Sequence, residues 1–269
     1  RHRNLPGEAI VGLDEEGRRT AITWAELPSR VAAVAAALTQ AGIGEGDVVA
    51  GYLPDIPEAV IAFLATASLG AVWSGCGQDY APEGAAARLG QLRPRALFTA
   101  DGYRWNGKDV DKRADSAALA GLLDELKLHV VIGDPVTVAG AADGAPESAA
   151  VQRNWATVVA GAETSDASPQ AVPVAADHPL WVLFSSGTTG RPKGIVHGHG
   201  GVLVEHLKAA GLHSGLGPGS VFFWQTALSW MMWNFQVAGL LVGARIVCYS
   251  GSPLYPDADT LWRIVAAEH

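Results

Sequence analysis

Residues 183–194 read Leu-Phe-Ser-Ser-Gly-Thr-Thr-Gly-Arg-Pro-Lys-Gly, so hydroxyl, glycine and basic residues lie between two apolar segments. Glycine allows tight turns that bring backbone N–H groups close to an anion, hydroxyls add further donors, and lysine adds positive charge. These properties suit a triphosphate. The residues expected to contact it are Ser185, Ser186, Gly187, Thr188, Thr189, Gly190 and Lys193. The stretch therefore predicts a phosphate-binding loop between two strands.

Other interpretations of this loop are weaker. Short Ser/Gly/Thr-rich segments are mostly ordinary hairpin turns, but ten ordered positions from Ser185 to Gly194 favour a specific site. The loop is not a Walker A motif, because Pro192 stands where a glycine should precede the lysine. The GxGxxG fingerprint of dinucleotide-binding folds is absent from the sequence as well. A P-loop ATPase or kinase is therefore disfavoured.

The segments around the loop alternate between strand-like and helix-like patterns of apolar residues. A helix that starts at a capping box, Thr23 with Glu26, is expected to end at Gly42. The other expected helices are 56–68, 82–91, 116–126, 201–212, 230–241 and 261–269, and the expected strands are 9–13, 20–22, 47–53, 71–73, 96–99, 129–132, 180–184, 194–197, 221–224 and 245–249. This alternation predicts an α/β fold of parallel βαβ units, with layered sheets and helices on both faces.

The composition divides the chain into two parts. Between residues 136 and 174 it shifts to Ala, Gly, Ser, Pro and Asp, which predicts a surface excursion or linker. We expect a first α/β subdomain over residues 1–175, and the start of a second, with the phosphate-binding loop, over residues 176–269. The last helical pattern, 261–269, meets no Gly or Pro stop signal, so this second subdomain is expected to be truncated.

Bulk composition disfavours several classes of protein. Nineteen Lys and Arg against 27 Asp and Glu give a formal charge of −8, which argues against a nucleic-acid surface. The apolar stretch 59–69 is too short to cross a bilayer, and the first residues contain no apolar core of a signal peptide. Cys76 and Cys248 lie far apart without a Cys/His cluster, which predicts buried thiols. We expect a cytoplasmic protein that binds neither nucleic acid nor membrane.

The loop resembles the Ser/Thr-Ser-Gly-Thr-Thr-Gly-x-Pro-Lys-Gly signature of the adenylate-forming superfamily of acyl-CoA synthetases, luciferases and peptide-synthetase adenylation domains. The resemblance implies part of the large N-terminal domain of that fold. It implies that Thr188, Thr189 and Lys193 contact the ATP β- and γ-phosphates, that Lys193 takes part in catalysis, and that ATP, Mg²⁺ and coenzyme A are used. In such enzymes a carboxylate attacks the α-phosphorus to give an acyl-adenylate and pyrophosphate, and the CoA thiol then displaces AMP.

The same resemblance implies that parts of the site lie outside this chain. The superfamily also uses an aromatic-Gly-x-Thr-Glu motif, a ribose-binding Asp and a lysine from a separate C-terminal domain. None of these is found in residues 1–269. The partner expected first is therefore the missing C-terminal domain of the same chain, and the fragment alone is expected to be inactive.

Three further stretches resemble acetoacetyl-CoA synthetases within the superfamily: residues 52–58 (Tyr-Leu-Pro-Asp-Ile-Pro-Glu), residues 70–74 (Gly-Ala-Val-Trp-Ser) and the block 195–233. They imply an acid–thiol ligase, an acetoacetate–CoA ligase. Two departures from that pattern fall near the acyl pocket, namely Ala-Leu-Ser at 227–229 in place of Thr-Thr-Gly and Gly-Cys-Gly at 75–77 in place of Ser-Cys-Ser. An acetyl- or propionyl-type short-chain synthetase and a nucleotide-binding relative without turnover therefore stay open.

Two residues are candidates for the acyl pocket. Trp230 lies where small-acid CoA synthetases place an aromatic wall that shortens the pocket, although spacing alone favours the core for a Trp/Met stripe. Asn234, four residues later, lies near the position of an aromatic or histidine gate in relatives, and its spacing leaves open whether it faces the site. His197 and His199 would share one face of a strand, but no third ligand accompanies them, so no metal site is expected.

Overall fold

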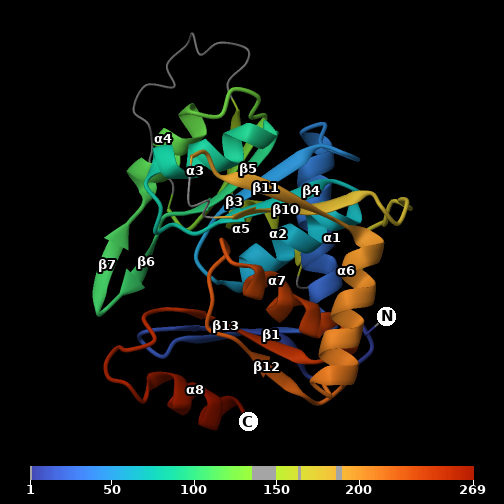
Figure 1. The fold of residues 1–269 in the computed structure, drawn as a ribbon, viewed down its shortest axis with the longest axis vertical. Coiled ribbons are helices and arrows are strands. Elements are labelled where there is room, and N and C mark those ends of the chain that lie inside the picture. Colours follow the sequence, from blue (N-terminus) through green and yellow to red (C-terminus); the bar gives the residue numbers. More distant parts are fainter. Residues whose placement is uncertain (1, 135–149, 163–164, 186–189) are drawn as a thin grey trace.

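Two sheets form the frame of the computed structural model, which describes residues 2–134, 150–162, 165–185 and 190–269 (Figure 1). The larger sheet has the order β11-β10-β4-β3-β5-β8-β9, the smaller one β12-β13-β1-β2, and β6 and β7 form a separate hairpin. The strands are β1 (Glu8–Asp14), β2 (Arg19–Thr23), β3 (Val48–Tyr52), β4 (Val72–Cys76), β5 (Ala96–Ala100), β6 (Gly102–Trp105), β7 (Lys108–Asp111), β8 (Leu128–Ile132), β9 (Val151–Asn154), β10 (Pro179–Ser185), β11 (Lys193–Gly198), β12 (Val221–Phe223) and β13 (Arg245–Ser250).

Helices cover both faces of the seven-stranded sheet. The helices of the described residues are α1 (Leu27–Gln40), α2 (Pro57–Ser68), α3 (Pro82–Leu89), α4 (Arg113–Gly121), α5 (Trp155–Val158), α6 (His199–His206), α7 (Met231–Val237) and α8 (Thr260–Glu268), the last of which lies beside the smaller sheet. There are also 3-10 segments at Gly90–Leu92 and Ala238–Val242 and a π-helical segment at Leu207–His213. In Figure 1, α2 and α7 lie between the two sheets, and α3 and α4 lie on the far side of the larger one. None of the described helices is long and apolar enough to cross a bilayer.

The central strands are apolar along their whole length because both of their faces are buried. Val49 on β3 and Phe98 on β5 belong to a cluster that reaches across to Ile10 and Ile246 of the smaller sheet. Their neighbours Ala50 and Leu97 point the other way and pack with residues of α3 and α4. One core therefore joins the two sheets, and a second lies beneath α3 and α4.

The α2 helix is held tightly against the smaller sheet. A Cβ atom on Gly12 of β1 would lie 2.7 Å from Cγ of Pro57, the first residue of α2, so only glycine fits at this contact. The predicted capping box before α1 is formed: Glu26 N–H donates to Thr23 Oγ1 at 3.1 Å, and Thr23 N–H donates to Glu26 Oε2 at 2.9 Å.

Several elements differ from the sequence-based expectation. The hairpin of β6 and β7 was not predicted, because its residues are half-exposed or exposed and show no apolar alternation. Within the expected linker 136–174, residues 151–154 form β9, which pairs in parallel with β8. The helix expected at 116–126 begins earlier, at Arg113, where the Asp111 carboxylate accepts the Arg113 N–H at 2.9 Å. The helix expected at 201–212 begins at His199 and continues as the π-helical segment.

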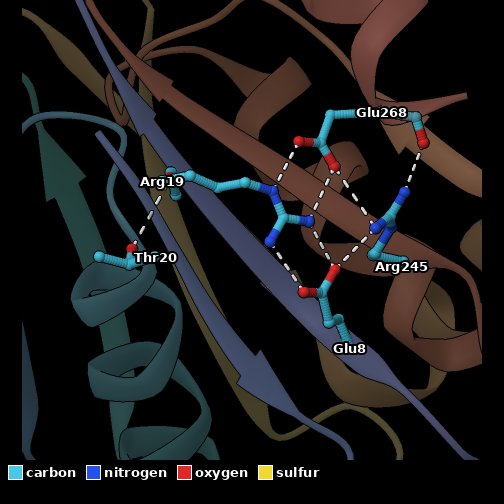
Figure 2. A network of polar contacts seen from close by, with 6 residues as sticks. Glu8, Arg19, Thr20, Arg245 and Glu268 are labelled. Carbon is cyan, nitrogen blue, oxygen red and sulfur yellow. Dashed lines mark hydrogen bonds and ion pairs between the residues drawn. The ribbon is translucent and has the colours of Figure 1, made fainter. Parts of the chain in front are cut away.

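Both sheets take strands from each side of residue 175, where the boundary between two subdomains was expected. The parallel neighbour of β1 in the smaller sheet is β13, and β10 of the larger sheet lies beside β4. An ion-pair network connects the smaller sheet to α8. Glu8 and Arg19 of the N-terminal hairpin pair with each other, Glu8 also pairs with Arg245 of β13, and Glu268 of α8 pairs with both arginines (Figure 2). The two ends of the chain therefore meet on one sheet.

Candidate active site

The phosphate-binding loop predicted from the sequence joins β10 to β11. These strands pair in antiparallel register, and Ser185 lies opposite Lys193 in the last pair before the loop. Gly190 has a φ of +100°, a backbone conformation that favours glycine, and Ser185, Gly190 and Lys193 are all exposed. Ser186, Gly187, Thr188 and Thr189 lie outside the described residues. Of the seven predicted phosphate-binding residues, the structure therefore places three, all at the mouth of one hairpin.

Hydrogen bonds hold the base of this hairpin in place. Ser74 Oγ of β4 donates to the Val182 carbonyl at 2.9 Å, and Gln91 Nε2 donates to the Pro192 carbonyl at 3.1 Å. Because β10 runs parallel to β4, the loop leaves the larger sheet at the same edge as the residues that follow β4 and β3. This is the carboxyl edge, where ligands bind in open α/β sheets.

A cavity of about 350 Å³ lies at this edge, where the carboxyl ends of strands from both sheets meet. Segments that follow β3, β4, β12 and β13 supply most of its lining, and two aromatic residues of β6 complete it. The lining residues are Leu53, Pro54, Asp55, Gly77, Gln78, Asp79, Tyr103, Trp105, Gln225, Thr226, Ala227, Tyr249, Ser250 and Gly251. The lining therefore joins apolar side chains to a few polar groups, as is typical of small-molecule sites.

Two glutamines leave hydrogen-bond acceptors at this lining. Gln78 Nε2 donates to the Ala100 carbonyl at 2.8 Å, and Gln225 Nε2 donates to the Gly251 carbonyl at 3.3 Å. Their Oε1 atoms are buried and have no partner among the described residues. Buried polar atoms are normally paired, so these two oxygens suit a ligand that carries N–H or O–H donors.

The Asp55 carboxylate is the charged group most deeply buried at the cavity. Burial raises its pKa to about 7, and hydrogen bonds from the Tyr249 N–H, the Gln236 amide and the Trp233 indole oppose that rise. Near neutral pH the group therefore divides between its ionised and its neutral form. Perturbed carboxyl groups in clefts are frequent at functional sites.

The two departures from the acetoacetyl-CoA synthetase pattern lie against each other. The Gly77 N–H donates to Ser229 Oγ at 2.8 Å, and a Cβ atom on Gly75 would lie 3.0 Å from the Leu228 carbonyl oxygen. Glycine at 75 therefore leaves room for the backbone of the 227–229 segment. Gly77 and Ala227 also line the cavity. The altered positions thus form one contact beside the cavity.

Residues 3–269 match the protein family described as AMP-binding enzyme. The chain belongs to this family. The match covers the phosphate-binding loop, both sheets and the cavity between them. The matched range therefore includes the whole carboxyl edge of both sheets.

Curated relatives and a solved structure are similar to this AMP-binding chain. An acetoacetyl-coenzyme A synthetase from Rhizobium meliloti (strain 1021) is 40% identical over 97% of the chain and 39% of the relative. Malonamoyl-CoA synthetase vrtB from Penicillium aethiopicum is 39% identical over 92% of the chain and 34% of the relative. The structure of acetoacetyl-CoA synthetase from Streptomyces lividans matches with 47% identity and a TM-score of 0.86, over 96% of the chain and 38% of that structure's chain. The layered α/β fold is confirmed, and the chain spans about two-fifths of these relatives.

Of the two residues predicted for the acyl pocket, Trp230 is exposed and Asn234 is buried. Trp230 is the N-cap of α7 and is 69% exposed, so it does not belong to the core of the described residues, whereas Trp233 does. Asn234 is 2% exposed, and neither polar atom of its side chain has a partner among the described residues. Neither residue lines the 350 Å³ cavity, although Trp230 follows its lining segment 225–227 closely. Their roles in an acyl pocket stay predictions.

The two histidines after the loop do not share a strand face. His197 lies on β11, and its Nδ1 accepts a hydrogen bond from Trp181 Nε1 at 2.7 Å. His199 is instead the first residue of α6, where burial lowers its pKa. Both histidines would share a strand face only if β11 extended to residue 199, but β11 ends at Gly198, which is the N-cap of α6. Within the described ranges, no group of three or more His, Cys, Asp or Glu side chains could hold a metal ion.

Reasoning from the sequence missed Asp55, Gln78 and Gln225. Asp55 carried a usable signal, because an acidic residue lies two positions after the end of a predicted strand, within the stretch Pro-Asp-Ile-Pro. The glutamines carried none, because their hydrogen-bond partners, the carbonyls of Ala100 and Gly251, lie more than twenty residues away in the chain and are not specified by any local pattern. The cavity is built by the meeting of two sheets, which a local pattern does not specify.

Proposed function

We propose that the complete protein to which this chain belongs is an ATP-dependent acetoacetate–CoA ligase. The observation that carries the proposal is the shared edge: the β10–β11 loop and the cavity both lie at the carboxyl ends of parallel strands. Similarity to acetoacetyl-CoA synthetases over nearly the whole chain supports the choice of acid. Because the chain spans about two-fifths of those relatives, the remaining part of the protein completes the site.

The chain's own residues act mainly in binding and orientation. Lys193, at the hairpin mouth, supplies a positive charge to the triphosphate, and Ser185 and the glycine-rich loop supply hydroxyl and backbone donors. Their contribution is to hold the α-phosphorus where the carboxylate of the acid attacks it, with loss of pyrophosphate. In the second half-reaction the CoA thiol attacks the acyl carbon and AMP leaves. The two unpaired glutamine oxygens accept N–H or O–H groups of a bound substrate.

Mg²⁺ is expected from the resemblance, and in nucleotide-dependent enzymes it is usually bound by one or two carboxylates together with substrate phosphates. Hard divalent cations prefer several carboxylate or phosphate oxygens. No such cluster of side chains is formed among the described residues. We therefore assign no residue of this chain to Mg²⁺ and derive no step through it.

A second candidate is the activation of another short acid. The contact between 75–77 and 227–229 departs from the acetoacetyl-CoA synthetase pattern at the cavity wall, and a malonamoyl-CoA synthetase is similar to the chain at nearly the same identity. A substrate that differs by one methylene in an apolar pocket is discriminated by about 1–3 kcal/mol. Acetoacetate and other short acids are therefore distinguished by measuring activity with each of them.

The deciding experiment is acid-dependent ATP–pyrophosphate exchange on the complete protein. The panel contains acetoacetate, malonamate, acetate, propionate and butyrate, with acyl-CoA formation measured in parallel. The highest kcat/KM is expected for acetoacetate. A higher kcat/KM for another acid would identify that acid as the substrate in place of acetoacetate. Absence of exchange with every acid would favour a nucleotide-binding relative without turnover.

A further inference from the structure

Asp55 connects the two sheets through one buried carboxylate. It follows β3, precedes the N-cap of α2 and is 5% exposed. Its Oδ1 accepts from Trp233 Nε1 at 3.1 Å, and its Oδ2 accepts from Gln236 Nε2 and from the Tyr249 N–H, both at 3.3 Å. The donors belong to α7 and β13, which follow Asp55 by more than 170 residues. A single side chain therefore ties the end of β3 to both elements.

The connection continues to the cavity wall. Gln236 Oε1 accepts the Trp224 N–H at 2.9 Å, so the amide that Asp55 orients also holds the first residue after β12. The next residues, 225–227, line the cavity, and Trp230 caps α7. At the other end, the Trp233 indole packs against Phe63 and Trp73, with ring centroids 6.1 and 6.3 Å away. Asp55 thus reaches both ends of the segment 224–233.

The ionised and neutral forms of Asp55 satisfy these partners differently. A carboxylate accepts these three hydrogen bonds and one from the Cys248 thiol, whereas a neutral acid carries an O–H that needs an acceptor of its own. Two titratable groups near Asp55 are the Cys248 thiol, which is hydrogen-bonded to Asp55 and whose pKa is raised first by burial and then by the Asp55 charge, and Glu58 of α2. Burial raises the pKa of Glu58, and the Arg30 charge opposes that rise. A change in the ionisation of Asp55 therefore changes the hydrogen bonds that it offers to α7.

We propose that Asp55 is a positioning residue, which acts through Gln236 and Trp233 to hold residues 224–230 in the arrangement that binds the small carboxylic acid. This inference rests on the proposed function and deepens it, because it names the group that orders the acid-binding side of the site. The β10–β11 loop is held by separate contacts from Ser74 and Gln91. Loss of the Asp55 carboxylate should therefore affect the acid more than ATP.

The test uses Asp55→Asn in the complete protein. A lost charge-assisted hydrogen bond at this depth predicts a rise of about tenfold in KM for the acid, with KM for ATP changed by less than about twofold. For the wild type, kcat/KM for the acid should rise from about pH 6 to about pH 8 as the carboxylate forms, because this ratio reports ionisations of the free enzyme. Asp55→Asn should lose that component of the profile.

Two further variants separate positioning from general stability. Thr99→Val is the matched control, because the Thr99 hydroxyl is buried and bonded to His129 Nε2 at 2.9 Å but does not line the cavity. It should leave KM for the acid and the pH profile unchanged. Gln236→Met removes the bond to Trp224 but keeps Asp55, so it should raise KM for the acid while the pH dependence remains.

Hydrogen exchange gives a readout that does not depend on the proposed function. Asp55→Asn should speed exchange in residues 221–237 of the complete protein by about tenfold, and Thr99→Val should not. Unchanged exchange in this segment, or equal rises in KM for acid and ATP, would overturn the positioning role. A third outcome is that Asp55→Asn speeds exchange although the wild type activates no acid. That outcome would overturn the proposed function and leave the structural link from Asp55 to Trp224 intact.

Discussion

At the scale of single residues, a few buried polar side chains organise the carboxyl edge of both sheets. Asp55 accepts hydrogen bonds from α7 and β13. Gln78 and Gln225 donate their amide N–H groups to backbone carbonyls, and their Oε1 atoms have no partner among the described residues. Asp55 thereby fixes the elements around the site, and the two glutamines provide unpaired hydrogen-bond acceptors beside it. The exposed residues at the loop, Ser185 and Lys193, are placed by strand register instead.

Lys193→Ala should weaken ATP use in the complete protein. A charge-assisted contact to a phosphate contributes about 1.5–3 kcal/mol, so adenylation should slow by about ten- to a hundredfold. Thioester formation from supplied acyl-adenylate should suffer less, because the triphosphate is then absent. Lys208→Ala, which removes another partly exposed lysine on the π-helical segment, is the control. Equal losses in both half-reactions would contradict a role for Lys193 at the phosphates.

Trp230→Gly should move substrate preference toward longer straight-chain acids. The prediction follows from the resemblance, in which this aromatic side chain closes the acyl pocket, and from its 69% exposure, which leaves it free to form such a wall. Chain-length preference is measured by pyrophosphate exchange with acids of increasing length. Trp262→Gly on α8, where the side chain is 72% exposed, is the matched control. An unchanged preference in folded Trp230→Gly would remove Trp230 from the pocket.

At the scale of elements, the sequence predicted best where local chemistry decides the structure. The capping box before α1, the glycine-rich hairpin and the strands buried on both faces carry their own signals, and all three are formed. The hairpin of β6 and β7 and the edge strand β9 carry weak signals, because their residues are largely exposed and gain their order from neighbours. Pairing with neighbouring strands, and not local propensity, therefore determines that these segments are strands.

Thr23→Ala should destabilise the start of α1. The substitution removes the acceptor for the Glu26 N–H and the hydroxyl that donates to Glu26 Oε2 at 2.8 Å. Loss of a capping side chain costs about 1 kcal/mol. Hydrogen exchange of the first turn of α1 measures the change, and Thr23→Ser, which keeps the hydroxyl, should behave nearly as the wild type. Equal effects of the two substitutions would show that the hydroxyl does not cap the helix.

At the scale of the whole molecule, both sheets are assembled from sequence-distant strands. The sequence predicted an α/β fold and the presence of these strands, but not that β1 pairs with β13, since parallel pairing across more than two hundred residues has no local signature. The cavity and Asp55 depend on that assembly, so they escaped prediction together. The loop could be predicted because its hydroxyl, glycine and basic residues lie within ten consecutive positions, and its role at a phosphate stays a prediction. The boundary proposed at residue 175 stays a prediction, with strands of both sheets on each side of it.

The assembly of the smaller sheet leads to a pH-dependent prediction for its ion-pair network (Figure 2). The hydrogen bond from Arg19 is the largest cause that lowers the pKa of Glu8 from 4.5 to about 2. Burial opposes this effect, and the hydrogen bond from Arg245 adds to it. Since the pKa of the folded state is depressed, this stabilisation is present above about pH 4.5 and is lost as the pH falls toward 2. Arg19→Met removes donors to both Glu8 and Glu268, so it should lower the opening free energy of α8 by about 1–2 kcal/mol at neutral pH, after allowance for partial exposure.

The measurement is hydrogen exchange of residues 260–268, corrected for intrinsic rates, between about pH 7 and pH 3. The gap between wild type and Arg19→Met should narrow as Glu8 is protonated. Arg18→Met is the matched control in the same hairpin, because Arg18 pairs with Asp14 at 2.6 Å but is 74% exposed and lies outside the network. Exposed pairs contribute about 0–1 kcal/mol, so α8 should hardly respond to the control. A pH-independent gap, or equal effects of the two substitutions, would mean that apolar packing and not the network holds α8 to the sheet.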